Sequence, residues 1–178
     1  MKTVYKLAIA VFSLTLIMSC GDDEFECPAK NEVNIDLSGE VVQACSGCLI
    51  TDENNPGNVY GRIDSISKYG FGMYYTLPDS LKDCDLKLIM SGKMRETENI
   101  TGYIAIAVHS VDSIYFWGNL FSSQHVKEIN KWIEFKDSIN IPKSANTSAS
   151  RTLKVFQFKE KGKGYFDLDN LNVKIIPQ

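Results

Sequence analysis

The sequence predicts an all-β protein, an antiparallel β-sandwich of about eight to ten short strands. Short runs of alternating apolar and polar residues are separated by turn-forming residues, and no stretch has the period of a long amphipathic helix. In the closing run, residues 165–176, the alternating apolar residues fall on even positions up to Leu168 and on odd positions from Leu171. This extra residue across Asp169 and Asn170 indicates a β-bulge, which bends a strand without ending it. Such a bent closing strand suits a sandwich of two sheets.

The chain is long enough for one domain with a sizeable core. It has 178 residues, of which 44% are hydrophobic and 23% are charged, as is ordinary for a globular protein. The net charge is −3, and the sequence has no basic patch. A mildly acidic chain of this kind is a poor partner for phosphate backbones, so we expect no nucleic acid partner.

The first residues are typical of an export signal. Lys2 and Lys6 precede a mostly apolar run, residues 7–18, which Ser19 and Cys20 follow. The run is too short to span a bilayer, which takes about 20 residues, but it suits a signal peptide. The segment that ends at Cys20 resembles the bacterial lipobox, whose cysteine is acylated with diglyceride and palmitate and becomes the new N-terminus. The alternative is an ordinary secreted protein with a cysteine there by chance.

The residues after Cys20 extend this prediction. Residues 21–26 are rich in acids and resemble the export tag of surface lipoproteins in the bacterial phylum that is rich in gut glycan foragers; the alternative is a solvated tether. We therefore expect a signal peptide in residues 1–19, an acidic flexible tether in residues 20–32 and one β-sandwich domain in residues 33–178. The expected location is the bacterial outer membrane, with the protein lipid-anchored and exposed at the surface.

Four further cysteines, Cys27, Cys45, Cys48 and Cys84, predict disulfides, because an even number in an exported protein favours bridges. Three pairings are open, and we favour bridges that join the N-terminal segment to the sandwich. The alternatives are a redox dithiol in the C-x-x-C formed by Cys45 and Cys48, or a zinc site. Both are disfavoured, because no helix follows this motif and the other two cysteines are distant in the sequence.

Strands are expected at regular spacing along the chain. They are residues 33–37, 41–44, 59–63, 70–77, 86–95, 103–108, 114–120, 132–141, 152–158 and 165–176. Tyr74 and Tyr103 lie on the face of their strands opposite the apolar one. One short helical piece is expected within residues 122–130, and a turn-rich loop at residues 52–57.

Residues 69–176 carry a resemblance to a known family. The segments Trp-Ile-Glu-Phe, Ile-Asn-Ile-Pro, Leu-Lys-Val-Phe and Phe-Asp-Leu-Asp-Asn-Leu, at 132–135, 139–142, 153–156 and 166–171, resemble the end of galactose-binding-like β-jelly-roll domains. Many non-catalytic carbohydrate-binding modules have this fold. The resemblance implies a sandwich of jelly-roll type and places Trp132 at the family's structural tryptophan, in the core. Its motifs are set more by fold than by ligand.

The same resemblance implies a structural calcium ion. In those modules an aspartate of the closing strand often helps to hold calcium between the first and last strands, and the matching residues here are Asp167 and Asp169. Calcium takes about six to eight oxygen ligands, for which Glu32, Asp36 and Glu40 are further candidates. The alternative is a solvated acidic pair beside the bulge. No other cofactor is expected.

Candidate sugar contacts are aromatic residues, because a pyranose ring has apolar faces and a polar rim. If Ile114 and Phe116 face the core, Tyr115 and Trp117 lie on the other, solvent-facing side of the sheet. The alternative for Trp117 is packing beneath a loop. Tyr74 and Tyr103 are weaker candidates.

No catalytic constellation occurs in the sequence. His109 and His125 stand among ordinary residues and are interpreted as structural, and neither Gly-x-Ser-x-Gly nor His-Glu-x-x-His is present. We therefore expect no enzymatic activity.

Asp-Ser followed by an aliphatic residue occurs four times. This pattern resembles the O-glycosylation motif of exported proteins in the same bacterial phylum, with Ser65, Ser80, Ser113 and Ser138 as acceptors. The alternative is turn chemistry ahead of a strand.

Together these features predict a non-catalytic, lipid-anchored surface protein that binds extracellular carbohydrate for glycan uptake. The alternative is a structural or adhesive lipoprotein domain that binds another envelope or pilus protein. An exposed aromatic platform on a concave face favours the first function, whereas a flat polar face favours the second.

Overall fold

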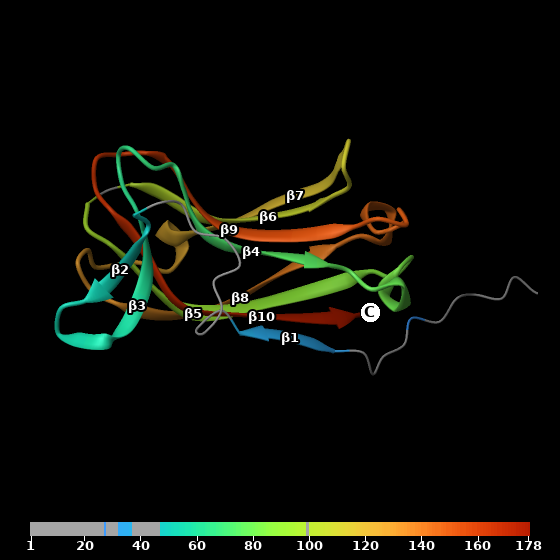
Figure 1. Cartoon of the computed structure of the whole chain (residues 1–178), viewed down its shortest axis with the longest axis horizontal. Helices are drawn as coiled ribbons and strands as arrows, with labels where there is room; N and C mark the ends of the chain where they lie inside the picture. Colours follow the sequence, from blue (N-terminus) through green and yellow to red (C-terminus); the bar gives the residue numbers. More distant parts are fainter. Residues whose placement is uncertain (1–26, 28–31, 37–46, 99) are drawn as a thin grey trace, which may run out of the picture.

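A computed structural model describes residue 27 and residues 32–36, 47–98 and 100–178. Within these residues ten strands form two antiparallel sheets that lie face to face (Figure 1). The prediction of an all-β sandwich of jelly-roll type is confirmed. The expected signal peptide, Cys20, most of the tether and the strand expected at residues 41–44 lie outside the described residues.

The larger sheet, called sheet A here, contains the first and last described strands side by side. Its order is β2 (Leu49–Asp52), β3 (Asn55–Ile63), β10 (Phe166–Pro177), β5 (Leu86–Glu96) and β8 (Ile133–Ile141), with β1 (Val33–Asp36) also paired to β10. Sheet B has the order β4 (Tyr69–Thr76), β9 (Thr152–Lys161), β6 (Thr101–His109) and β7 (Ile114–Phe121).

The core lies between the sheets, where alternate residues of each strand point inward. Phe71 and Met73 of β4, Ile104 and Ile106 of β6 and Leu88 of β5 are each at most 3% exposed. The opposite parity of β4 and β6 carries Tyr74 and Tyr103, as alternation predicts. Sheet B therefore buries one face in the core and turns the other outward.

The predicted bulge in β10 is confirmed. The register of β10 against β5 shifts between Asp169 and Asn172, and Asn170 has φ 51. Asparagine adopts this left-handed conformation more readily than most residues. On β5, Gly92 faces the bulge: a Cβ there would lie 2.8 Å from the carbonyl oxygen of Asp169. The missing side chain makes room for the extra residue.

One local prediction is wrong, and another is confirmed over a shorter stretch. The stretch 52–57 is a β-hairpin rather than a loop, because β2 and β3 pair on either side of a tight turn in which Asp52 Oδ1 accepts a hydrogen bond from the Asn54 amide. Most residues of this stretch are of types that favour turns, so the sequence gives no strand signal there. The helical piece expected within 122–130 is only a 3-10 turn, Ser122–Gln124.

A disulfide joins Cys27 to Cys84, which tethers the N-terminal segment to the residues just before β5. This is one of the three pairings that the sequence left open. Cys48 is buried, at 2% exposure, and is also disulfide-bonded. Cys45 lies outside the described residues. In the described part of the chain, no helix has the length and apolar character that crossing a membrane requires.

Candidate functional site: an aromatic groove on sheet B

The outward face of sheet B is built from rows of residues that neighbour each other across four strands. One row consists of Trp117 on β7, Ala107 on β6, Lys154 on β9 and Tyr74 on β4. Two aromatic side chains thus stand at the edges of the sheet, with a methyl group and a lysine between them. The small side chain of Ala107 keeps the surface low beside Trp117.

The next two rows continue this face. They are Asn119, Ala105, Phe156 and Gly72, followed by Phe121, Tyr103, Phe158 and Tyr69, in the same strand order. Gly72 cannot carry a side chain, because a Cβ at that position would meet the backbone of Val155 and Phe156. The floor therefore stays low toward β4, while aromatic rings rise along its borders.

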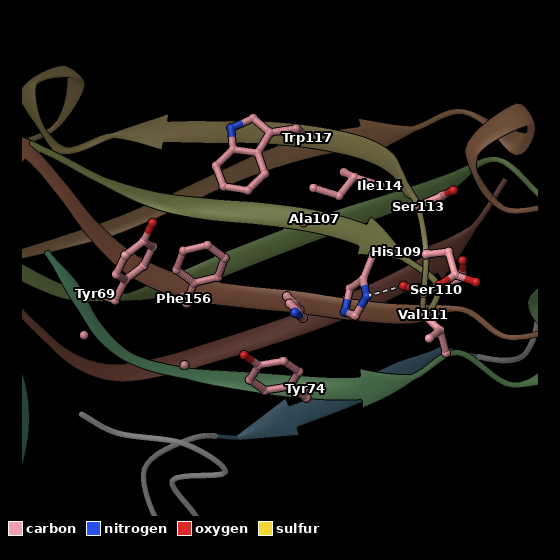
Figure 2. A pocket seen from close by; sticks show the side chains of 14 residues that line it. Tyr69, Tyr74, Ala107, His109, Ser110, Val111, Ser113, Ile114, Trp117 and Phe156 are labelled. Carbon is pink, nitrogen blue, oxygen red and sulfur yellow. Dashed lines mark hydrogen bonds between the residues drawn. The ribbon is translucent and has the colours of Figure 1, made fainter. Parts of the chain in front are cut away.

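The first row, together with Gly72, Phe156 and Tyr69 from the next two rows and the turn after β6, lines an open groove of about 820 Å³. Figure 2 shows Trp117 on one side of it and Tyr74 and Tyr69 on the other, with Phe156 and His109 between them. Trp117 is 47% exposed, Tyr74 42% and Tyr69 59%. The volume lies in the range of about 300–1,000 Å³ that is typical of small-ligand sites.

The aromatic rings support one another. Phe156 packs at a steep angle against Trp117, with 5.9 Å between ring centroids, and contacts Tyr69 at 6.0 Å. The first contact is edge-on and the second is tilted, and both restrict the orientation of the rings. The groove therefore presents aromatic surface in a largely preset arrangement.

Polar groups lie near the strand ends at one side of the groove. His109 Nδ1 lies 2.9 Å from the carbonyl oxygen of Ser110, which can only accept, so Nδ1 carries the proton (Figure 2). In the neutral ring Nε2 is then an acceptor, and it has no partner among the described residues. His109 is thus only half satisfied, in contrast to the structural role that its sequence context suggested. Asp112 and Ser113 lie in the turn that follows.

The four predicted sugar contacts separate into two pairs. Trp117 and Tyr74 both line the groove. Tyr115 is 40% exposed but lies outside the groove lining, and its hydroxyl is hydrogen-bonded to Ser110 Oγ at 3.1 Å. Hydrogen bonding of the phenolate form to Ser110 and Ser148 lowers the pKa of Tyr115. Tyr103 is only 8% exposed, because its ring packs between Phe121 and Phe158, and burial raises its pKa.

The prediction that Ile114 faces the core is wrong. The register between β6 and β7 shifts after the Val108–Phe116 pair, so that Ile114 pairs with His109 and is 66% exposed on the groove side. One extra residue in β7 relative to β6 is enough to place Ile114 on the opposite face of the sheet. Sequence reasoning missed Phe156 and Lys154, although their alternation with core residues on β9 would have placed them on this face.

The prediction that Trp132 lies in the core is also wrong. Trp132 lies outside the buried core and packs against the outer side of sheet A, where the Arg95 guanidinium carbon lies 4.5 Å from its ring centroid. Tyr60 meets the same indole edge-on at 5.3 Å. The two tryptophans of the chain are therefore attached to different sheets.

Asp167 binds two arginines. Its fully buried carboxylate accepts hydrogen bonds from Arg62 Nε at 2.7 Å and Arg95 Nη2 at 2.6 Å, so three neighbouring strands are clamped together. Asp169 accepts from the Asn58 amide at 3.3 Å. The described part of the chain contains no cluster of three or more His, Cys, Asp or Glu side chains that could hold a metal ion. Calcium binding by Asp167 and Asp169 stays a prediction.

The remaining predicted positions are on the surface. Ser65, Ser80, Ser113 and Ser138 are all exposed. Asp64 Oδ1 accepts hydrogen bonds from the Ile66 and Ser67 amides, which fits the turn interpretation for Ser65. Ser138 instead lies within β8, where its amide donates to Asp137 Oδ1, so the turn interpretation does not hold there.

No protein-family model and no curated protein matches the chain. Solved structures that are similar include the C-terminal CBM6 of a marine laminarinase from Zobellia galactanivorans, with 9% identity, TM-score 0.42, and 82% of this chain and 99% of that chain covered. A xylan-binding module CBM15 has 13% identity, TM-score 0.46 and coverage of 82% and 97%. The VP2 subviral particle of infectious bursal disease virus has 10% identity, TM-score 0.46 and coverage of 84% and 33%. At such identities, the ligand has to be argued from this chain's own residues.

Proposed function

We propose that the protein is a non-catalytic carbohydrate-binding protein whose glycan lies in the groove on sheet B. The observation that carries this proposal is the pair of half-exposed aromatic rings, Trp117 and Tyr74, on opposite sides of a groove whose floor contains Ala107, Lys154 and Phe156. Sugar rings stack on such aromatic faces through their apolar C–H surfaces. Their hydroxyls need polar partners, which the Lys154 ammonium and the exposed side chains of Asp112 and Ser113 can supply.

The composition of the groove supports binding without catalysis. Asp112 is the one carboxylate among the described residues that line it. Glycoside hydrolysis ordinarily uses two carboxylates on opposite sides of the scissile bond. The concave aromatic surface also favours a glycan over a protein surface of the envelope, for which a flatter polar face would be the better match.

We further propose that the domain is held at the outer membrane by lipid on Cys20 and captures glycan for uptake. The basic and apolar leader, the lipobox-like end and the acidic stretch after Cys20 support this proposal. Metabolic labelling with a palmitate analogue should mark the wild-type protein and leave Cys20→Ser unmarked. Equal labelling of both proteins would contradict acylation at Cys20.

Affinity gel electrophoresis tests the glycan proposal. The mature domain is run through gels that contain barley β-glucan, xylan, galactomannan or polygalacturonate, beside Trp117→Ala and Tyr115→Ala. Tyr115 is the matched control, because it lies on the same strand with 40% exposure against 47% for Trp117 but outside the groove. We expect at least one polysaccharide to retard the wild type and the Tyr115 variant but not the Trp117 variant. Equal retardation of all three proteins would exclude the groove.

A further inference from the structure

We propose that the groove selects glycans that carry carboxylate or sulfate groups, through Lys154. This inference rests on the proposed glycan-binding function and names the chemical class of the ligand. Its basis is the position of Lys154 on β9, an inner strand of sheet B, in the row between Trp117 and Tyr74.

The ammonium group of Lys154 lies in the groove and has no carboxylate partner among the residues that the structure describes. Its Nζ lies 4.7 Å from the centroid of the Tyr74 ring, a cation–π contact that positions the charge beside the predicted stacking surface. None of the ion pairs between described residues includes Lys154. The π face takes no conventional hydrogen bond, so the three N–H donors of the ammonium can serve a ligand.

The charges around Lys154 make this site specific. Among the described residues that line the groove it is the one lysine or arginine, and Asp112 is exposed in the turn at the end of β6. The protein as a whole has a net charge of −3, so it repels a polyanion at long range. Preference for an anionic glycan would then have to come from a local contact rather than from diffuse attraction.

An anionic sugar residue suits this arrangement better than a neutral one. A ring stacked on Trp117 or Tyr74 brings its substituents over Ala107 and Lys154, which lie between them in the row. A carboxylate or sulfate oxygen accepts a charge-assisted hydrogen bond, which is roughly twice as strong as the bond to a neutral hydroxyl. The carboxylate of a uronic acid and a sulfate ester share this chemistry.

The test compares pairs of polysaccharides that have one backbone and differ in charge. Polygalacturonate is compared with its methyl ester, and dextran sulfate with dextran, by affinity electrophoresis and calorimetry at low and high NaCl. We expect the wild type to bind one anionic member about tenfold more tightly than its neutral partner, with the difference shrinking as salt rises. The first pair reports a uronic acid and the second a sulfate ester.

Variants separate this inference from the function on which it rests. Lys154→Gln should lose the preference but keep binding to the neutral member, and Lys154→Arg should retain the preference. Lys136→Gln, an exposed lysine on β8 of the other sheet, is the control for overall charge and should behave as wild type. If wild type binds neutral and anionic partners equally, or Lys154→Gln weakens both equally, the inference fails while glycan binding stands. If no polysaccharide binds wild type, both fail.

Discussion

Trp117 on β7 and Tyr74 on β4 lie at opposite ends of one cross-strand row, with Ala107 and Lys154 between them. Three strand spacings separate the two rings, which corresponds to roughly 14 Å between strand axes. The sheet thus holds two aromatic walls apart at a distance that its hydrogen-bond register fixes. The pairing of the strands therefore sets the width of the groove, and the four side chains of this row set its chemical character.

The low floor of this row gives the first prediction. Ala107→Leu should place a branched side chain between Trp117 and Lys154 and weaken polysaccharide binding at least tenfold. Ala107 lies on the outer face of sheet B but is only 3% exposed, so the larger side chain must displace its neighbours and should also lower the melting temperature. Calorimetry beside a thermal melt makes the comparison. Unchanged affinity in the folded variant would show that the glycan does not cross this row.

Alternation alone could predict much of this face. Trp117 and Tyr74 were correctly placed opposite the core, because each lies in a regular stretch of its strand where every second residue is apolar. The bulge at Asn170 was also predictable, since one extra residue in β10 leaves a visible change of parity. The face on which a residue lies, and the point where the alternation shifts, can both be seen in the sequence of a single strand.

What depends on pairing between segments could not be predicted in this way. Ile114 lies on the face opposite to the predicted one, because the register between β6 and β7 shifts. Tyr103 is covered by aromatic rings from the two neighbouring strands. Trp132, which was expected in the core, packs instead against Arg95 of β5. The Cys27–Cys84 pairing likewise depends on which segments meet in space. Neighbours across strands are not visible in the sequence of one strand.

The clamp at Asp167 gives a prediction about stability. Asp167→Asn leaves the side chains of Arg62 and Arg95, which are 24% and 21% exposed, without their carboxylate. Breaking a buried ion pair on one side costs about 3–5 kcal/mol. Urea unfolding measures the loss. Asp169→Asn is the control, since its partners are the neutral side-chain amides of Asn58 at 3.3 Å and Asn170 at 3.4 Å, and it should cost at most about 1.5 kcal/mol. Similar small losses in both variants would argue against the clamp.

Glu96 gives a prediction about pH. Its side chain is 5% exposed, and burial raises the pKa of its carboxyl, partly opposed by a hydrogen bond from Ser122. The folded protein therefore binds this proton more tightly than the unfolded chain does. The Glu96 carboxyl makes its whole contribution to the free energy of unfolding below the unfolded pKa of about 4.5. This contribution is lost as the pH rises through the higher pKa of the folded state.

Glu96→Gln removes this titration and preserves the shape of the side chain. The variant should match wild type at acid pH and exceed it in free energy of unfolding at neutral pH. Exposed Glu98→Gln is the control and should leave the pH profile unchanged. The measurement is urea unfolding across the acid to neutral range. A Glu96 variant that is less stable at neutral pH would contradict the account.

The Cys27–Cys84 bridge should stabilise the domain without contributing to the groove. The bridged residues are 57 positions apart, and removal of a native disulfide from a small exported domain costs about 2–5 kcal/mol. The double variant Cys27→Ala with Cys84→Ala should melt at a lower temperature and, below its melt, bind polysaccharide as wild type does. An unchanged melting temperature, or lost binding in the folded variant, would contradict this separation.

The central claim, that glycan lies in the groove of sheet B, is tested most directly by NMR of the indole N–H groups. The chain has two tryptophans, Trp117 in the groove and Trp132 on the outer side of sheet A, so one reports on the site and the other is an internal control. Trp117→Phe assigns the two signals. With soluble oligosaccharides of the polysaccharide that retards the protein, the Trp117 signal should shift progressively and that of Trp132 should stay in place. A shift of Trp132 alone, or of neither signal at saturating ligand, would contradict the claim.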